Sequence, residues 1–101
     1  MEVTVKFVSP LRSPSGKNEE RIECSRETTI DDLLRIMEEK LGDKLSQIVF
    51  DQGSGKPRAN IAICLQREGV PRPRRIELLE GMDTELQPND ALIIFYPMGG
   101  G

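Results

Sequence analysis

The segment Asp90-Ala91-Leu92-Ile93-Ile94-Phe95-Tyr96-Pro97 determines the fold that we expect for this chain. It carries no charge after Asp90, and a continuously apolar run of this kind is typical of a strand buried inside a sheet. Pro97 fixes φ and lacks an amide hydrogen, so strand pairing is expected to stop there. The segment therefore predicts a central strand, followed by the glycine-rich residues Met98-Gly99-Gly100-Gly101.

Two further strands are expected upstream of this segment. In residues 60–66, Ile61, Ile63 and Leu65 share one face of a strand, because side chains alternate between the faces of a sheet. Residues 76–79 predict a short strand. Between it and the last strand lies a turn-rich segment in which Leu86 is the one obvious apolar residue, and Pro88-Asn89-Asp90 is a turn signal.

Residues 30–41 predict the main helix, because its apolar residues recur at helical spacing: Ile30, Leu33, Leu34, Met37 and Leu41. Thr28 or Thr29 is suited to cap the amino end, with acidic residues in the first turn near the positive end of the helix dipole. Gly42 supplies the matching signal at the carboxyl end. Residues 45–50 fit either one helical turn or a short strand, and the pattern does not separate the two.

The amino-terminal residues predict two strands joined by a long loop. Residues 2–8 alternate between apolar and polar side chains, which is typical of a half-buried strand. Residues 9–19 contain prolines, serines and a glycine and are expected to form a loop. A second strand is expected over residues 20–25. Together these elements predict an α+β domain in which one main helix packs on one face of a mixed sheet of four to five strands.

Composition restricts the classes of protein that the chain can belong to. The net charge is −3, with 14 basic against 17 acidic residues, so the chain as a whole is not suited to bind polyanions. It contains no histidine, which removes the commonest general base and metal ligand. Cys24 and Cys64 lack metal-ligand spacing and are expected to be buried free thiols, although a disulfide between them is left open. No signal peptide and no apolar run long enough to span a membrane are present, which predicts a soluble, cytoplasmic protein that does not bind a membrane. The sequence also predicts no bound cofactor, no metal and no nucleic acid.

Two local motifs carry less weight. Gly53-Ser54-Gly55-Lys56 lacks the first glycine of a phosphate-binding loop and has Pro57 where Ser or Thr is needed, so a surface turn is expected. Arg67, Arg72, Arg74 and Arg75 form a basic cluster without interleaved aromatic residues, which argues against nucleic-acid binding. A solvated loop is the default interpretation of this cluster. The more specific alternatives are contact with an acidic partner surface or with an anionic pterin.

Three motifs, spread over nearly the whole chain, resemble one family. They are Phe7-Val8-Ser9-Pro10-Leu11-Arg12, the helix start Thr29-Ile30-Asp31-Asp32-Leu33-Leu34, and the turn that runs from Asp83 to Asp90 and leads through the last strand to Pro97-x-x-Gly100-Gly101. This combination resembles the ubiquitin-like β-grasp sulfur carriers of the MoaD/ThiS type, and most of all the small subunit of molybdopterin synthase. The resemblance implies a β-grasp domain over residues 1–97 and a flexible carboxyl-terminal glycine tail over residues 98–101.

The resemblance also implies what the chain does. In this family the terminal carboxylate, here that of Gly101 after Gly100, is adenylated by an ATP-dependent activating enzyme of the MoeB/ThiF type and converted to a thiocarboxylate. The chain would then be a carrier, or the small subunit of a synthase, and not itself an enzyme. It would donate sulfur to an acceptor enzyme such as the large subunit of molybdopterin synthase. Glycine suits this role because it has no Cβ to obstruct passage through a narrow channel.

Strand parity indicates where partners would bind. If Leu92 and Ile94 face the core, then Phe95 faces outward, where it would form an apolar patch with Val8 beside the tail. Arg12 would add an ionic contact by analogy with the family. The predicted partner-binding residues are therefore Val8, Arg12, Phe95, Pro97, Met98 and Gly99. The alternative is that the long loops simply cover this face.

Two other functions stay open at this point. The same tail would serve a ubiquitin-like modifier that is conjugated through Gly101 to lysines of target proteins. A β-grasp module that binds partners without covalent chemistry, with an incidental glycine tail, is the third possibility.

Overall fold

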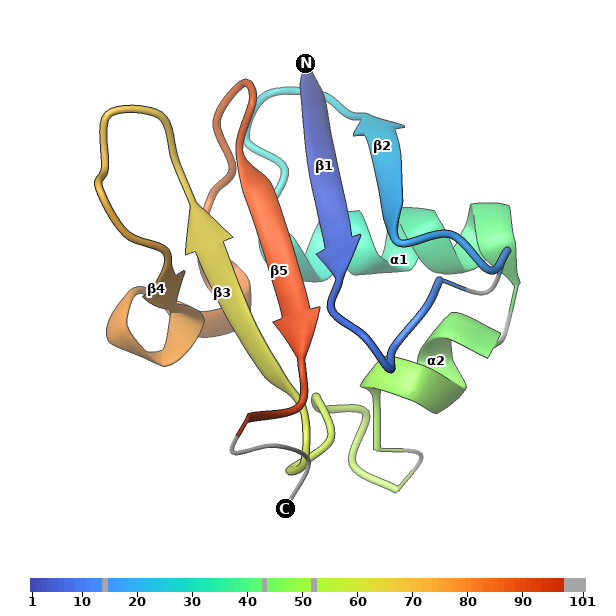
Figure 1. Ribbon diagram of the computed structural model, residues 1–101. Helices are drawn as coiled ribbons and strands as arrows, with labels where there is room; N and C mark the ends of the chain where they lie inside the picture. Colours follow the sequence, from blue (N-terminus) through green and yellow to red (C-terminus); the bar gives the residue numbers. More distant parts are fainter. Residues whose placement is uncertain (14, 43, 52, 98–101) are drawn as a thin grey trace.

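The computed structural model of the chain describes residues 1–13, 15–42, 44–51 and 53–97. One mixed sheet of five strands, in the order β2-β1-β5-β3-β4, packs with one face against helix α1 (Figure 1). The strands are β1 (Glu2–Phe7), β2 (Glu19–Glu23), β3 (Ala62–Gln66), β4 (Arg74–Arg75) and β5 (Ala91–Phe95). The predicted α+β class, with one main helix on one face of a mixed sheet, is confirmed.

Strand β5 lies at the centre of the sheet, as its uncharged sequence predicts. It runs parallel to β1 on one side and antiparallel to β3 on the other. Leu92 of β5 is aligned with Val5 of β1 and with Leu65 of β3. A central strand is hydrogen-bonded on both sides and covered by neighbouring side chains, which explains why β5 carries no charge.

Helix α1 (Ile30–Leu41) begins at a capping box. The amide of Asp32 donates to the Thr29 hydroxyl at 3.1 Å, and the amide of Thr29 donates to the Asp32 carboxylate at 3.2 Å. Thr29 is therefore the cap, whereas the Thr28 hydroxyl donates to the Ser25 carbonyl at 2.6 Å. At the other end, Gly42 has a φ of 86°, a left-handed value that favours glycine.

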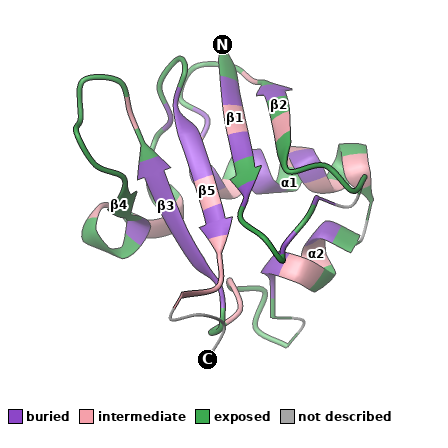
Figure 2. Ribbon diagram, viewed as in Figure 1, coloured by how far each residue is buried: buried purple, intermediate pink, exposed green. Residues whose placement is uncertain are grey.

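The hydrophobic core lies between α1 and the sheet. Figure 2 shows buried residues along the inner side of α1 and along β1, β5 and β3. The predicted helical stripe is buried at Ile30, Leu33, Leu34 and Met37, and the predicted strand face is buried at Val3, Val5 and Phe7. Leu86 is also buried, and its amide donates to the Thr28 carbonyl at 2.9 Å, which ties the turn-rich segment to the start of the helix.

The segment that the sequence left open is helical. Helix α2 (Lys44–Val49) buries Leu45 and Val49, which are four residues apart and so lie on the same side of a helix. Phe50 follows directly and is buried as well. Helical spacing of the buried residues, and not strand alternation, is therefore the pattern in this segment.

The strand predicted for residues 76–79 is wrong. The segment is a 3-10 helix, η1 (Ile76–Leu78), and the strand β4 is the arginine pair just before it. The amide of Leu79 donates to the Ile76 carbonyl at 2.9 Å. Because a 3-10 helix has three residues per turn, Ile76 and Leu79 both turn toward the core, which alternation in a strand would not allow. A second such turn, η2 (Gly81–Asp83), follows.

Strand β3 is buried on both faces over residues 62–65, which includes the predicted burial of Cys64. Ile63 and Leu65 belong to the core beneath the sheet, whereas Ala62 and Cys64 lie on the opposite face and are nevertheless buried. The strand begins at Ala62 and not at residue 60, because the amide of Ile61 closes a turn onto the Arg58 carbonyl. The face of the sheet away from α1 is therefore not uniformly wet.

Candidate functional site

The carboxyl ends of β1 and β5 lie side by side at one end of the sheet, because these two strands are parallel (Figure 1). The amide of Val8 donates to the Ile94 carbonyl at 3.0 Å and extends the ladder beyond β1. Val8 and Phe95 are thereby neighbours, as strand parity predicts. We call this end of the sheet, with Val8, Phe95, Tyr96 and Pro97, the tail end.

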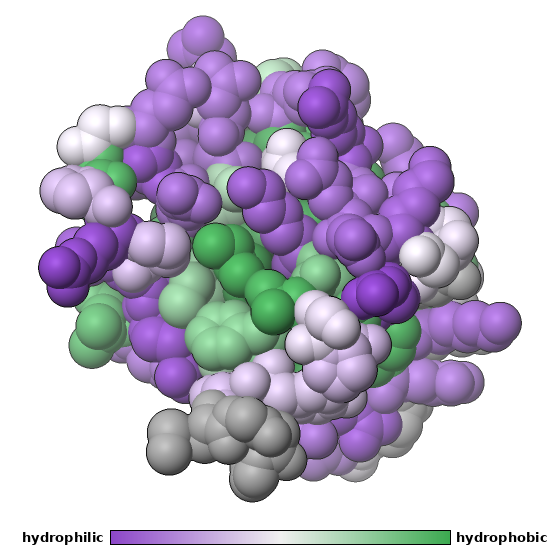
Figure 3. Space-filling view, in the orientation of Figure 1, coloured by the Kyte–Doolittle hydropathy of each residue, from purple (hydrophilic) through white to green (hydrophobic). Residues whose placement is uncertain are grey.

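An apolar patch covers the middle of the face that points away from α1. The register aligns Phe95 with Ala62 and Ile93 with Cys64, and Val8 lies on this face with them. Figure 3 shows an apolar area in the middle of this face, surrounded by hydrophilic side chains. We call the five residues the open-face patch: Val8, Ala62, Cys64, Ile93 and Phe95.

The exposure of this patch is greatest beside the tail end. Val8 is 46% exposed, and Ile93 and Phe95 are half-buried. The exposed parts of Val8, Ile93 and Phe95 do not pack against the domain itself. Together they form an apolar patch in contact with water, and such a patch is suited to bind another protein. The three outward side chains are those that a partner at the tail end would meet.

The thiol of Cys64 keeps the patch uncharged near neutral pH. Burial raises the pKa of the Cys64 thiol, while the neighbouring Arg75 opposes the shift and Glu77 adds to it. Both cysteines are free, with Cys64 buried and Cys24 half-buried, so no disulfide joins them. Because the raised pKa favours the neutral thiol, the open-face patch carries no thiolate under ordinary conditions.

Alkylation of Cys64 is expected to be at least about tenfold slower in the folded protein than in urea at about pH 8, because burial hinders both ionisation and access. A Cys24→Ala variant leaves Cys64 as the single thiol, and iodoacetamide labelling followed by mass spectrometry measures the rate. The folded state binds this proton more tightly, so stability should decline as pH rises above the ordinary pKa of a thiol. Equal labelling rates in the folded and unfolded states would contradict the burial of this side chain.

Arg12 lies in the turn that follows β1, close in the chain to the open-face patch. The amide of Leu11 donates to the Val8 carbonyl at 2.9 Å and closes this turn. The Arg12 guanidinium is exposed and donates to the adjacent Leu11 carbonyl at 2.9 Å. This geometry leaves most of its donors facing solvent, which suits the rim of a protein interface.

The chain leaves the sheet through Tyr96 and Pro97, both half-buried, and Tyr96 packs against the core. These contacts position the point from which the glycine-rich residues continue. The predicted sites Met98, Gly99, Gly100 and Gly101 lie outside the described residues. Their roles therefore stay predictions.

A buried ion pair, which the sequence did not predict, lies at the opposite end of β5. Asp90 is 1% exposed. Its carboxylate accepts from Arg67 Nε at 3.0 Å, from Arg67 Nη2 at 2.9 Å and from the Gln87 amide at 2.8 Å. Arg67 Nη2 also donates to the Glu85 carbonyl at 3.2 Å. The hydrogen bonds from Arg67 to Asp90 raise the pKa of the guanidinium, although partial burial opposes the shift.

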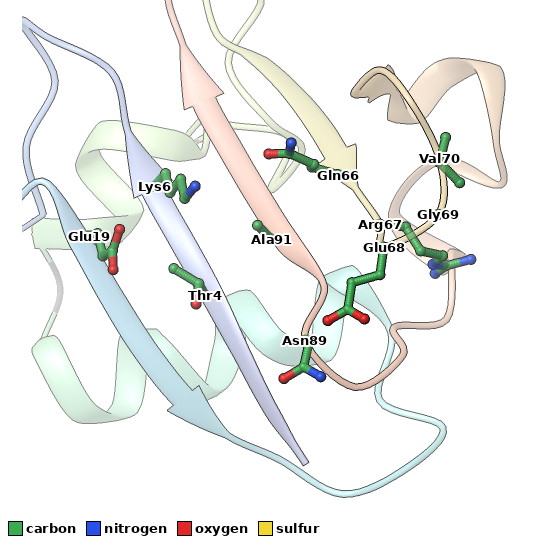
Figure 4. A pocket seen from close by; sticks show the side chains of 10 residues that line it. All are labelled: Thr4, Lys6, Glu19, Gln66, Arg67, Glu68, Gly69, Val70, Asn89 and Ala91. Carbon is green, nitrogen blue, oxygen red and sulfur yellow. The ribbon is translucent and has the colours of Figure 1, made fainter.

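A shallow depression lies next to this ion pair, on the same face as the open-face patch. Figure 4 shows its side chains spread across β2, β1, β5, the end of β3 and the loop that follows it, without converging on one point. The charges that line it have mixed sign, with Lys6 and Arg67 against Glu19 and Glu68. Among residues 1–13, 15–42, 44–51 and 53–97 there is no cluster of three or more side chains suited to hold a metal ion. No helix within the same ranges is long and apolar enough to cross a membrane.

Comparison with known sequences finds one class of protein. No family model matches the chain. The small archaeal modifier protein 3 of Haloferax volcanii is 28% identical over 101 residues, which cover the whole of both chains.

Solved structures show the same architecture. The small archaeal modifier protein 1 of Methanosarcina acetivorans is 27% identical with a TM-score of 0.69, over 99% of this chain and 96% of that one. A Pyrococcus furiosus protein described as molybdopterin converting factor, subunit 1, is 22% identical with a TM-score of 0.64, over 97% and 99%. CysO of Amycolatopsis orientalis, solved in complex with BexX, is 20% identical with a TM-score of 0.67, over 98% and 99%. The last two likenesses concern the fold.

The sheet order, the single main helix and these likenesses define a ubiquitin-like β-grasp protein. Within that class the resemblance to small modifiers and sulfur carriers, predicted from the sequence motifs, is confirmed over the full length of the chain. The similarity is to small carrier and modifier proteins and not to catalysts.

Proposed function

We propose that the chain is a sulfur carrier whose Gly101 carboxylate is activated and converted to a thiocarboxylate, with molybdopterin biosynthesis as the first candidate pathway. The observation that carries the proposal is that the strand leading to the glycine-rich residues is the central strand, and that it ends beside an exposed apolar patch. The domain then acts as a handle, and the open-face patch as the surface by which enzymes recognise it.

The proposed chemistry uses one functional group of this chain, the carboxylate of Gly101. A carboxylate oxygen of Gly101 attacks the α-phosphorus of ATP, which forms an acyl adenylate and releases pyrophosphate. The terminal sulfur of a cysteine persulfide on a partner enzyme then attacks the glycyl carbonyl, and AMP leaves. A second thiol cleaves the resulting acyl disulfide, which releases the thiocarboxylate and forms a disulfide on the partner. The missing Cβ of glycine leaves the carbonyl open at each attack.

Two kinds of partner follow from this chemistry. An ATP-dependent enzyme of the MoeB/ThiF type would activate the chain, and the large subunit of a molybdopterin synthase would accept the sulfur. The structure of CysO in complex with BexX supports partnership of this fold with another protein, and the likeness to the Pyrococcus furiosus converting factor subunit supports the molybdopterin pathway. Val8, Arg12, Phe95 and Pro97 are the described residues that we propose at these contacts, together with Met98 and Gly99.

Intact mass spectrometry tests the proposal. The chain is incubated with ATP, the activating enzyme of the same organism and a sulfur source. Replacement of one oxygen by sulfur at Gly101 is the expected result. An unchanged mass, with the activating enzyme shown to be active on another carrier, would favour a non-covalent interaction module.

Conjugation to target proteins is the second candidate function. It is favoured by the full-length similarity to a small archaeal modifier protein. The acyl adenylate would then be attacked by a lysine amine, directly or after transfer to a thiol, with formation of an isopeptide bond. Gly-Gly-Gly remnants on lysines of cellular proteins, released by cyanogen bromide cleavage after Met98, would establish this role, and their absence would leave sulfur transfer as the use of the tail.

A Val8→Asp variant is expected to lower affinity for the activating enzyme at least about tenfold, because it places a charge in the centre of an apolar contact. Its free energy of unfolding should change by no more than about 0.5 kcal/mol, since the Val8 side chain is 46% exposed and lies outside the core. Val70→Asp is the matched control, because Val70 is 40% exposed and lies away from the tail end. Isothermal titration calorimetry measures the affinity. Equal losses in both variants would show that the effect is one of net charge.

A further inference from the structure

A second exposed surface lies along the β4 side of the sheet, away from the tail end. It is formed by the segment between β3 and η2, at the side of the sheet opposite β2 (Figure 1). We call it the basic edge and define it by Val70, Arg72, Arg74 and Leu78. The function proposed above does not use these residues.

The basic edge contains most of the large apolar exposure of the described residues. Among the described residues, the exposed large hydrophobic side chains are Val70 at 40% and Leu78 at 67% on this edge, and Val8 at 46% at the tail end. Leu78 is turned outward by the 3-10 geometry that brings Ile76 and Leu79 to the core. Nothing in the packing of the domain requires a leucine at this position, so its apolar surface is available to a partner.

The charges of the basic edge are opposite in sign to those of the chain as a whole. Residues 67–79 carry four arginines and two glutamates, whereas the net charge of the chain is −3. Arg67 is held by Asp90, and Arg75 pairs with Glu77 at 2.9 Å. In the described part of the chain no ion pair engages Arg72 or Arg74, and both are exposed.

A small hollow joins the apolar and basic features of this edge. It is lined by Leu65, Arg67, Val70, Arg74 and Leu79 and has a volume of about 80 Å3. Its lining therefore combines aliphatic side chains with those of two arginines. Such a hollow is suited to take an apolar side chain that has a carboxylate beside it.

We propose that the basic edge is a docking surface for an acidic protein, one that presents an apolar side chain flanked by carboxylates. The apolar side chain of the partner enters the hollow beside Val70, the carboxylates bind Arg72 and Arg74, and Leu78 packs against the partner's apolar surface. Arginine and large apolar side chains of this kind carry most of the energy in protein interfaces. Single-stranded nucleic acid is disfavoured as the occupant, because residues 67–79 contain no aromatic side chain on which bases stack.

The basic edge lies away from the tail end, so a partner can bind there while the tail end is occupied. The tail end belongs to β1 and β5, whereas the basic edge lies beyond β3 at the side of the sheet. A partner on the basic edge therefore leaves Val8 and Phe95 uncovered. An acidic receptor is thus able to bind the domain while the tail is engaged by an enzyme or joined to a target, and the proposal does not depend on which of the two roles the tail has.

Site-specific crosslinking tests the proposal with a defined probe. A photoreactive benzoylphenylalanine replaces Leu78 in the full chain, which is expressed in its native host. In the control, benzoylphenylalanine replaces Arg21, which is exposed on the opposite side of the sheet. The expected product is an adduct with an acidic protein from Leu78 and not from Arg21. The partner is then purified, and its affinity for the unmodified chain is measured by calorimetry at low and high salt.

Charge reversal decides the outcome. R72E/R74E is expected to lower affinity for the purified partner at least about tenfold, and Leu78→Ser to lower it by a similar factor. The matched control K40E/K44E reverses two exposed charges elsewhere and should leave affinity unchanged. Thermal melts establish that each variant is folded, and Val8→Asp should not affect this binding. Any one of four results would overturn the proposal. They are adducts only with RNA, adducts only with a second copy of the chain, no adduct, and equal losses of affinity in R72E/R74E and K40E/K44E.

Discussion

Removal of Gly101 is expected to lower thiocarboxylate formation by at least about two orders of magnitude, because the reacting carbonyl no longer reaches the position that the activating enzyme provides. Extension of the chain by a Ser-Gly pair after Gly101 should have the same effect, since the carboxylate is then moved away from the glycyl position. Pyrophosphate release and intact mass measure the two steps separately. The melting temperature should not change, because every buried core residue of the described chain lies at or before Ile94.

The control for this prediction inserts the same Ser-Gly pair between Ser54 and Gly55, in an exposed turn. This variant has the same composition as the extended one and should retain full activity. Retained activity after deletion of Gly101 would mean that the tail is not the reacting group. A large loss of stability on deletion would mean that it is part of the core.

Substitution of Asp90 by Ala is expected to lower the free energy of unfolding by about 2–4 kcal/mol, because it leaves the Arg67 guanidinium and the Gln87 amide without their acceptor. The lower part of that range applies if water reaches Arg67, whose side chain is 29% exposed. For a domain of this size the melting temperature would fall by roughly 10–25 °C. Urea unfolding followed by circular dichroism measures the change.

Arg67→Ala removes the other partner of the buried pair and is also expected to lower the free energy of unfolding, and Arg35→Ala is its matched control. Arg35 pairs with Asp31 at the same 2.9 Å distance, but it is exposed on the surface of α1, so its removal should have little effect on stability. The contribution of Arg67 should persist throughout the neutral pH range. Its pKa is raised in the folded state, so on the alkaline side of neutrality the stabilisation is lost only when the solution becomes strongly alkaline. Equal effects of the two arginine substitutions would contradict the importance of burial.

The main elements of the fold could be predicted from the sequence because their burial is periodic. Val3, Val5 and Phe7 alternate with polar residues, which fits a strand with one buried face. The apolar residues of α1 recur at helical spacing, which fits a helix with one buried side. The uncharged run after Asp90 predicts a central strand for the same reason. The outward position of Phe95 beside Val8 follows once parity and parallel pairing are assumed.

The remaining features depend on contacts that sequence spacing does not encode. Arg67 and Asp90 are 23 residues apart, and the pattern of each suggests only a loop cation and a turn residue. Ile76 and Leu79 are compatible with a strand until the 3-10 hydrogen bond between them is known. Ala62 is buried on the open face together with Cys64, whose burial was predicted, although alternation alone places Ala62 only on the face opposite Ile63 and Leu65.

The central place of β5 also determines how the domain would respond to tension on its carboxyl end. A pull applied beyond Pro97 loads the ladders to β1 and β3 together, lengthwise along the strand, so that their hydrogen bonds must shear at once instead of unzipping one after another. Because β1 is parallel and carries the amino terminus at the far end, a force between the two ends of the domain acts in this same direction. We expect a domain that resists unfolding when it is drawn by that end into a narrow channel.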